Sequence, residues 1–299
     1  MKILGQAWFA TWLLVSMALA SALIKLVSLI GLPKERSEGI AIAIIQTAWR
    51  ISICLTPWMR FTASRGWDEE WAKVLAIMEA SDARTNHKPW MFLSNHTSFM
   101  DVLLFTTLTR TSVMWKCRTY MDNALFKTPI LSSICRGCGH FPVYFKSTEE
   151  GKFTVDKEKN AEVDKLVDAH LKTGNLCFYP EGQVNKDPDN IMAFRFGGMK
   201  KALDVDARLV LFVAVGNPRV WPKKAPVGGM PGHVNYGLKL IAPDGAKAYV
   251  AQLRGRDDLT TEDKEMADHE LMAKFLRLAM QENYDCLKEG ANDNKAKDD

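Results

Sequence analysis

Residues 89–101 read Pro-Trp-Met-Phe-Leu-Ser-Asn-His-Thr-Ser-Phe-Met-Asp, and this stretch decides the fold. Its apolar part, 89–93, predicts a short strand of the kind that is buried on both faces. Residues 99–109 are expected to form a helix, and the polar segment 94–98 joins the two. A strand that turns directly into a helix is the repeating unit of an α/β fold.

The same alternation of strands and helices continues on both sides of this stretch. Apolar residues recur at helical spacing over 68–80 and 157–172, and Gly174 supplies a helix stop after the second. The run Leu-Val-Leu-Phe-Val-Ala-Val at 209–215 is typical of a fully buried strand. Further strands are expected at 112–117, 141–145, 176–179, 234–241 and 248–253, and a long helix at 262–287. We therefore predict an α/β fold with a mostly buried mixed sheet flanked by helices.

The N-terminus carries two apolar runs that predict a membrane element. Residues 7–24 hold no charge, and residues 39–58 are broken only by Arg50. The first run is long enough to span a bilayer, whereas Arg50 would be costly at the bilayer centre. We therefore expect a helical hairpin that either spans twice or dips into one leaflet. The alternative is a secretory signal peptide, but its cleavage would leave the second apolar run in place.

Length and composition bound the domain organisation. The chain has 299 residues, 47% of them hydrophobic, which is ordinary for a folded protein. We predict a membrane hairpin at 1–62, an α/β domain at 63–288 and a polar tail at 289–299. The net charge of +4 is too mild to indicate nucleic-acid binding, and it suits anionic lipid or a phosphorylated substrate. No glycine-rich nucleotide motif is present.

The cysteines and histidines give no metal signal. The six cysteines are scattered, so they are expected to be reduced thiols in a domain that faces the cytosol. Cys135 and Cys138 form a single C-x-x-C pair, which we interpret as two small residues in a turn. The six histidines lack metal-ligand spacing, so no metal is expected.

His96 and Asp101 are the first candidates for chemistry. Five positions apart, they would point in different directions on one helix of about 3.6 residues per turn. They can meet if His96 lies on the loop and Asp101 in the first turns of the following helix. The carboxylate would then fix the imidazole tautomer and leave the other nitrogen to take a proton from an alcohol. Equally, residues 94–98 could be helix caps and His96 an ordinary loop residue.

Two further segments carry charge at a turn. In Tyr-Pro-Glu-Gly-Gln, 179–183, the Pro and Gly force a turn that would present Glu181 at the sheet edge, where it could orient a cation that holds phosphate. Residues 194–201, Phe-Arg-Phe-Gly-Gly-Met-Lys-Lys, place glycines at a helix start beside cations, which suits an anion. Taken alone, the first could be an acidic turn and the second a solvated basic face.

Together and in this order, the segments resemble the glycerolipid acyltransferase family over about residues 87–220. The block N-H-x-x-x-x-D is similar to Asn95, His96 and Asp101. A second block is similar to Lys116, 126–129 (Phe-Lys-Thr-Pro) and 139–146, a third to 179–183 and 194–197, and a fourth to 213–215. Lys146 stands where the family usually has arginine, Gln183 where it has threonine and Ala214 where it has proline, which leaves the acceptor's identity open.

The resemblance implies an acyl-CoA:lysophospholipid O-acyltransferase. His96 would be the base, Asp101 would orient it, and no covalent acyl-enzyme would be needed. Acyl-CoA would be the co-substrate, with no cofactor and no metal, and a membrane lipid would be the acceptor, 1-acyl-glycerol-3-phosphate giving phosphatidate. The resemblance implies a substrate site formed by Asn95, Lys116, Lys146, Glu181, Gly182, Arg195 and Gly197.

The resemblance also implies a membrane location, and it leaves alternative functions open. The catalytic domain would face the cytosol from the endoplasmic reticulum membrane of a eukaryote or the inner membrane of a bacterium. Another lysophospholipid or glycerol-3-phosphate could be the acceptor. A non-catalytic lipid-binding membrane protein of the same fold, or a hydrolase that uses His96 to activate water, are the alternatives from other classes. A serine hydrolase has no support, because the chain lacks a G-x-S-x-G elbow.

Overall fold

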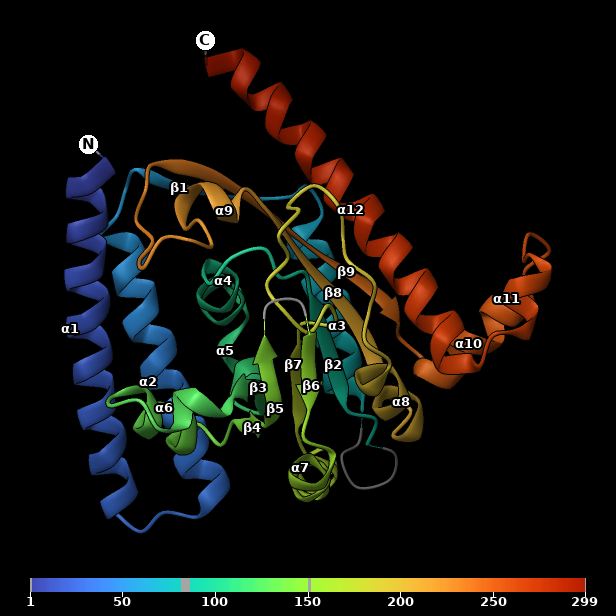
Figure 1. Cartoon of the computed structure of the whole chain (residues 1–299), viewed down its shortest axis with the longest axis horizontal. Helices are drawn as coiled ribbons and strands as arrows, with labels where there is room; N and C mark the ends of the chain where they lie inside the picture. The colour runs from blue at the N-terminus through green and yellow to red at the C-terminus, as the bar shows by residue number, and fades with distance from the viewer. Residues whose placement is uncertain (1, 82–86, 150–151, 299) are drawn as a thin grey trace. The chain divides into compact units, whose positions relative to one another are not determined.

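The computed structural model describes residues 2–81, 87–149 and 152–298 (Figure 1). Its contacts divide the chain into two units. Unit 1 comprises Met1–Ala7, Thr56–Phe105 and Phe178–Asp299, and unit 2 comprises Trp8–Leu55 and Thr106–Cys177. Each unit is described by itself, and the domain boundaries expected from the sequence stay a prediction.

Unit 1 contains a mixed sheet. Its strands β1 (Met59–Ala63), β9 (Gly232–Ala242), β8 (Arg208–Val215) and β2 (Trp90–Ser94) follow the order β1-β9-β8-β2. Strands β1 and β9 are parallel, β9 and β8 antiparallel, and β8 and β2 parallel. Every residue of β2 is buried, as is β8 beyond its first residue. The predicted α/β fold with a mostly buried mixed sheet is confirmed.

Helices cover both faces of this sheet. Helix α3 (Trp67–Ala80) lies on one face and the long helix α12 (Asp268–Asp298) on the other (Figure 1). Neighbouring residues of β9 face the helices on opposite sides of the sheet. The ring centroids of Tyr236 and of Trp67 on α3 lie 4.8 Å apart, whereas Gly237 faces Leu287 on α12. The remaining helices of unit 1 are α4 (Met100–Leu108, which ends in unit 2), α8 (Phe196–Asp204), α9 (Asn217–Val220), α10 (Ala246–Arg254) and α11 (Thr261–Glu265).

Unit 2 contains parallel strands in the order β7-β3-β4 and an antiparallel hairpin, β5-β6. The strands are β3 (Cys117–Asp122), β4 (Phe141–Val143), β5 (Phe145–Glu149), β6 (Lys152–Val155) and β7 (Asn175–Phe178), the last ending in unit 1. Its helices are α1 (Lys2–Leu29, which begins in unit 1), α2 (Lys34–Cys54), α5 (Thr111–Met114), η1 (Asn123–Phe126), α6 (Leu131–Gly137) and α7 (Lys157–His170).

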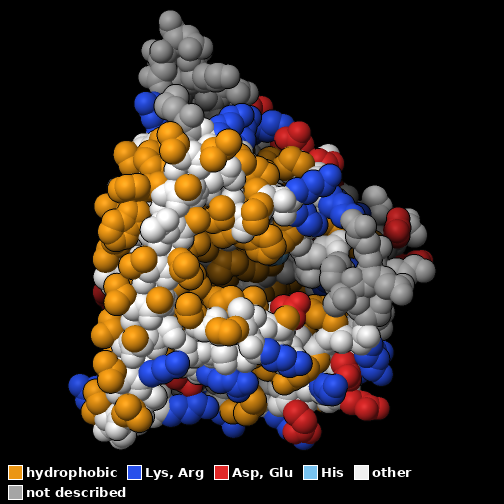
Figure 2. Space-filling view, turned by 60° about the vertical axis from the view of Figure 1, so that its left-hand side comes forward, with side chains coloured by type: hydrophobic (Ala, Val, Ile, Leu, Met, Phe, Trp, Pro, Cys, Tyr) orange, Lys and Arg blue, Asp and Glu red, His pale blue; other side chains and the backbone are white. Residues whose placement is uncertain are grey.

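The N-terminal helices form the expected hairpin. Helices α1 and α2 run antiparallel side by side (Figure 1), and the Ser16 and Ser52 hydroxyls hydrogen-bond at 2.8 Å. Within the described residues, α1 alone is long and apolar enough to cross a membrane. Figure 2 shows hydrophobic side chains gathered on the side of the molecule that carries α1. The large exposed ones include Ile3, Leu4, Leu14, Leu19, Leu26 and Leu29.

Helix α2 makes polar contacts with the rest of unit 2. Gln46 donates to the carbonyls of Thr106 and Thr109 at 2.7 and 2.9 Å. The Arg50 guanidinium donates to the carbonyl of Thr107 at 3.0 Å. These carbonyls lie at and just beyond the C-terminal end of α4, where a cation and N–H donors are favoured. The charge that interrupts the second apolar run therefore binds protein carbonyls.

Three local predictions differ from the structure. Residues 248–253, expected as a strand, lie in α10, because Ala246, Val250 and Leu253 face the core at helical spacing. Residues 112–117 form the short helix α5 and then β3, which begins only at Cys117. The long C-terminal helix is interrupted at Met266–Ala267, after a capping box of Thr260 and Asp263 starts α11, and α12 continues to Asp298.

Candidate active site

His96 and Asp101 meet at the end of β2. His96 lies on the loop after the strand, and Asp101 lies in the first turn of α4. The imidazole Nδ1 is 3.1 Å from Oδ2 of Asp101. The spacing of five works because the chain leaves an extended strand before it enters the helix, so the two side chains are not on one regular helix. The structure thus brings His96 and Asp101 together, and their catalytic roles stay a prediction.

The Asp101 carboxylate is buried and accepts several donors. Its side chain is 1% exposed. Oδ2 accepts the backbone N–H groups of Thr97 and Ser98 at 2.6 and 2.8 Å, and Oδ1 accepts the amide of Asn217. A carboxylate offers acceptors only, so the contact with Asp101 places the N–H of the neutral His96 ring on Nδ1 and leaves Nε2 with a free lone pair.

One face of the His96 imidazole ring is also held in place. The ring of Tyr179, which follows β7, stacks on it with ring centroids 4.2 Å apart and planes inclined by 28°. The His96 side chain is 14% exposed, so it is packed but remains in contact with solvent. A general base in this position is oriented on two sides and is still reachable by a hydroxyl group.

Glu181 holds the backbone of His96. Its Oε1 accepts the His96 backbone N–H at 2.7 Å, and Oε2 accepts the Asn185 amide at 2.8 Å and the Met192 N–H at 3.0 Å. Burial raises the pKa of Glu181, and the N–H groups of His96 and Met192 act to lower it. These hydrogen bonds go to the loop that carries His96 and to its own loop, and the expectation that Glu181 orients a phosphate-binding cation stays a prediction.

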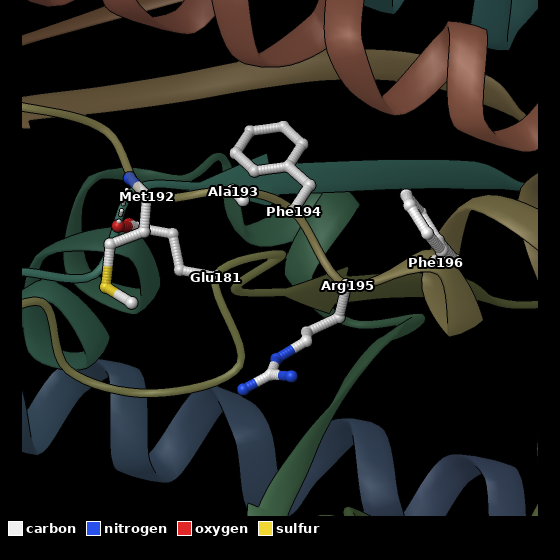
Figure 3. Close-up of a pocket in the computed structure, with 6 residues that line it drawn as sticks. All are labelled: Glu181, Met192, Ala193, Phe194, Arg195 and Phe196. Atoms are coloured by element: carbon white, nitrogen blue, oxygen red, sulfur yellow. Dashed lines mark hydrogen bonds between the residues drawn. The ribbon is translucent and has the colours of Figure 1, made fainter. Parts of the chain in front are cut away.

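Arg195 borders a cavity of about 350 Å³. Its backbone N–H donates to Pro180 O at 2.7 Å, and its side chain lies over Gly182, which has a φ of 72°. A side chain at Gly182 would be strained and would touch the stem of Arg195, 2.9 Å away. In Figure 3, the Arg195 guanidinium and the Phe194 ring point to opposite sides of their segment. The cavity is lined by Glu181, Met192, Ala193, Phe194, Arg195 and Phe196.

The guanidinium of Arg195 is available to a ligand. The residue is exposed, and its side chain makes no hydrogen bond or ion pair with another described residue. Gly197 lies two positions further along the chain, in the first turn of α8, and a side chain at this position would meet open space. An unpaired guanidinium at a helix start is suited to bind a phosphate with two parallel hydrogen bonds.

Asn95 connects the loop after β2 to strand β8. Its side chain accepts the N–H of Ala214 and donates to the carbonyl of the same residue, both at 2.9 Å. The side chain is fully buried. Both polar atoms of the side chain are engaged in these bonds, and its predicted part in substrate binding stays a prediction.

Lys116 and Lys146 lie in unit 2. Lys116 precedes β3, and its carbonyl accepts the N–H of Asn175 at 2.8 Å, whereas Lys146 is exposed on β5. The geometry of unit 1 does not test their predicted part in substrate binding, so it stays a prediction. In the described residues, no group of three His, Cys, Asp or Glu side chains is placed to hold a metal ion.

Two residues of the site were not expected from the sequence. Asn217 is 116 positions from Asp101 and follows a purely apolar strand, so no local pattern indicates it. Trp221 accepts the Ser98 hydroxyl on its carbonyl at 2.6 Å. The one available signal was position: Asn217 and Trp221 lie two and six residues after Val215, where the buried strand β8 ends.

Comparisons with known proteins concern the family and the fold. Residues 77–215 match the family model described as Acyltransferase. Four chains of solved structures match, among them the crystal structure of the 1-acyl-sn-glycerophosphate (LPA) acyltransferase PlsC from Thermotoga maritima. That match has a TM-score of 0.64, covers 96% of each chain and has 14% sequence identity, so it shows a shared fold. None of the curated proteins matches the chain.

Proposed function

We propose a reaction for this chain, which belongs to the glycerolipid acyltransferase family: it transfers a fatty acyl group from acyl-CoA to the free hydroxyl of a lysophospholipid. The proposed acceptor is 1-acyl-glycerol-3-phosphate, and the product is phosphatidate. The observation that carries the proposal is the contact of His96 Nδ1 with the buried Asp101 carboxylate, which leaves Nε2 free as a base.

The proposed step needs no covalent enzyme intermediate. Nε2 of His96 takes the proton of the acceptor hydroxyl while the oxygen attacks the thioester carbonyl. The carbon–sulfur bond then breaks, the thiolate leaves, and the imidazolium returns the proton to it. The products are an ester and free coenzyme A, so atoms and charges balance. Asp101 stays ionised throughout and stabilises the imidazolium.

Arg195 supports a phosphorylated acceptor. Its guanidinium is exposed at the cavity beside Glu181, the residue that holds the backbone of His96. A phosphate bound there would be anchored on the same loop that positions the base. The cavity volume of about 350 Å³ falls within the range of small-ligand sites.

Helix α1 supports action at a membrane. Its length and composition suffice to cross a bilayer, and it exposes large apolar side chains such as Leu14 and Leu19. Burying such side chains in lipid is favourable by about 25 cal/mol per Å² of apolar surface. We propose that α1 brings the enzyme to the surface where a lysolipid and a fatty acyl chain both partition.

An acceptor panel tests the proposal. Purified protein in phospholipid vesicles receives labelled acyl-CoA or acyl-carrier protein with 1-acyl-glycerol-3-phosphate, glycerol-3-phosphate or lysophosphatidylcholine, and both lipid product and free fatty acid are measured. The expected result is transfer to 1-acyl-glycerol-3-phosphate from acyl-CoA. His96→Ala should lower the rate by about 10²–10⁴-fold.

His233→Ala is the matched control. His233 lies in the same unit on β9 and hydrogen-bonds Thr62, so its loss should leave the rate unchanged. Folded wild-type protein that transfers to none of the acceptors would refute the proposal. Release of free fatty acid without an acceptor would indicate a hydrolase instead.

A further inference from the structure

We propose that Asn217 joins His96 and Asp101 as a positioning residue, which keeps the Asp101 carboxylate aimed at His96. The inference rests on the proposed acyl transfer, because it assigns a role within that same site. Asn217 touches no reacting atom. It acts through the carboxylate that orients the base.

Among the residues that the structure describes, Asn217 is the donor to the Asp101 carboxylate that lies far from it along the chain. It follows β8 directly after Gly216, whose φ of 98° turns the chain sharply, and it is the first residue of α9. Its Nδ2 donates to Oδ1 of Asp101. The other donors to that carboxylate bind Oδ2 and come from 96–98, within five positions of Asp101. Asn217 therefore binds Oδ1, the oxygen to which residues 96–98 do not donate, and so sets the rotation of the Asp101 carboxylate group.

The second amide atom of Asn217 is left without a partner. The residue is fully buried, and its Oδ1 has no hydrogen-bond partner within the described ranges. Turning the amide over would place this oxygen against the Asp101 carboxylate, where two acceptors would repel each other. A buried, unsatisfied carbonyl destabilises a fold. The contact with Asp101 is thus kept at the expense of stability, which is typical of functional sites.

Other contacts show that the segment 214–221 frames the catalytic loop. Ala214 binds both polar atoms of the Asn95 side chain, and Trp221 O accepts the Ser98 hydroxyl. The contacts of Ala214 and Trp221 hold side chains of the loop, whereas Asn217 is the residue of this segment that binds the Asp101 carboxylate. A variant at 217 can therefore separate the orientation of the charge from the folding of the loop.

The test uses two substitutions, Asn217→Leu and Asn217→Asp. Leucine has a similar volume and no donor. An introduced carboxyl group donates to Asp101 when it is protonated and repels it when ionised. Its ionisation is disfavoured by burial and by the neighbouring carboxylate, so it should titrate above its ordinary range. The titratable and charged groups near this point are Asp101, His96, Glu181, Tyr284 of α12 and Arg219 of α9.

The expected results differ between the two variants. Asn217→Leu should lower kcat at least about 10-fold with an unchanged KM, short of the about 10²–10⁴-fold loss of removing the base. Asn217→Asp should retain activity at the acidic end of the profile and lose it as pH rises, which adds a descending limb that the wild type lacks. Asn235→Asp, at a buried asparagine on β9, should follow the wild-type profile.

A readout without turnover separates this inference from the proposed function. In protein labelled with ¹³C and ¹⁵N in its histidines, the ring shifts of His96 should show the Nδ1–H tautomer in the wild type and a mixture in Asn217→Leu. Such a mixture supports the inference even if no acyl acceptor is found. An unchanged tautomer in Asn217→Leu, or an Asn217→Asp profile parallel to that of the wild type at every pH, would overturn it.

Discussion

The backbone N–H of His96 donates to Oε1 of Glu181 at 2.7 Å, although 85 positions separate the two residues. The carbonyl of His96 also accepts the Asn185 N–H at 2.6 Å. His96 is thus fixed by its ring, through Asp101, and by both polar groups of its backbone. The turn after β7 belongs to the geometry of the candidate site because it holds the loop that carries His96.

Glu181→Gln is expected to lower kcat without removing a reacting group. A glutamine side chain offers one acceptor where the carboxylate offers two, and its amide would face an N–H donor. Leaving a buried donor unsatisfied costs about 1–3 kcal/mol. The displaced loop should reduce kcat by about 10²-fold, the typical cost of a 1 Å misplacement.

Glu70→Gln is the control for that substitution. Glu70 is also a buried carboxylate that accepts a backbone N–H, that of Leu240 at 2.7 Å, but it lies on α3 away from the catalytic loop. The Glu70→Gln substitution should lower the melting temperature and leave kcat per folded molecule unchanged. If both variants lower kcat equally, the effect of Glu181 is general destabilisation.

Asp101→Asn should reduce kcat by about 10²–10⁴-fold. The amide would meet the N–H groups of Thr97 and Ser98 with its own donor, and it could not fix the tautomer of His96. The comparison is Asp263→Asn, at a buried helix-capping carboxylate of α11. That variant should melt earlier than wild type but transfer acyl groups at the wild-type rate per folded molecule. Equal losses of kcat in the two variants would contradict the assigned role.

Arg195→Ala should raise KM for a phosphate-bearing acceptor by about 10-fold or more, because one charge-assisted hydrogen bond contributes about 1.5–3 kcal/mol. Arg195→Lys should have a KM between those of the wild type and Arg195→Ala, since lysine keeps the charge and loses the planar fork. Steady-state kinetics at varied acceptor concentration measure these KM values. Arg256→Ala, at an exposed residue paired with Asp258, serves as control. An unchanged KM in Arg195→Ala would place the headgroup elsewhere.

Stability at low pH should depend on Glu70. Burial acts to raise the pKa of Glu70, but the hydrogen bonds from Lys73 and Leu240 and the charge of Lys239 outweigh it, so the pKa is lowered. A folded-state pKa below the unfolded value means that the stabilisation is present above about pH 4.3 and is lost as pH falls through the folded-state value. Melting curves of wild type and Glu70→Gln should therefore differ by about 2–4 °C at pH 7 and converge in acid. A gap that stays constant with pH would contradict this.

The local part of the site could be predicted from the sequence, and the remote part could not. His96 and Asp101 are close along the chain, and a strand that turns into a helix brings them together. Asn217 and Glu181 reach the same loop only through the order of strands in the sheet, which no spacing encodes. The same holds for the contacts of Glu181: the turn predicts its position at the sheet edge, but not the N–H donors of His96 and Met192 that its carboxylate accepts.

The errors in the fold have a similar origin. Residues 248–253 are a short apolar segment, and so short a window fits a strand as well as a helix. The guanidinium of Arg50 donates to carbonyls of residues 107 and 109, and the sequence around α2 does not indicate these partners. The long buried run at 209–215 was assigned correctly, because seven apolar residues in a row leave a central strand as the simplest solution.

The contacts of α2 bear on how the protein can be made. Arg118 is 2% exposed, and its guanidinium binds Glu38 on α2 at 2.9 Å. A truncated version that starts after residue 55, designed for expression without detergent, would lose that carboxylate and leave a buried cation uncompensated, together with the carbonyls now bound by Gln46 and Arg50. The segment that resembles a removable anchor is a structural partner of the rest of unit 2, and soluble preparations should shorten α1 alone.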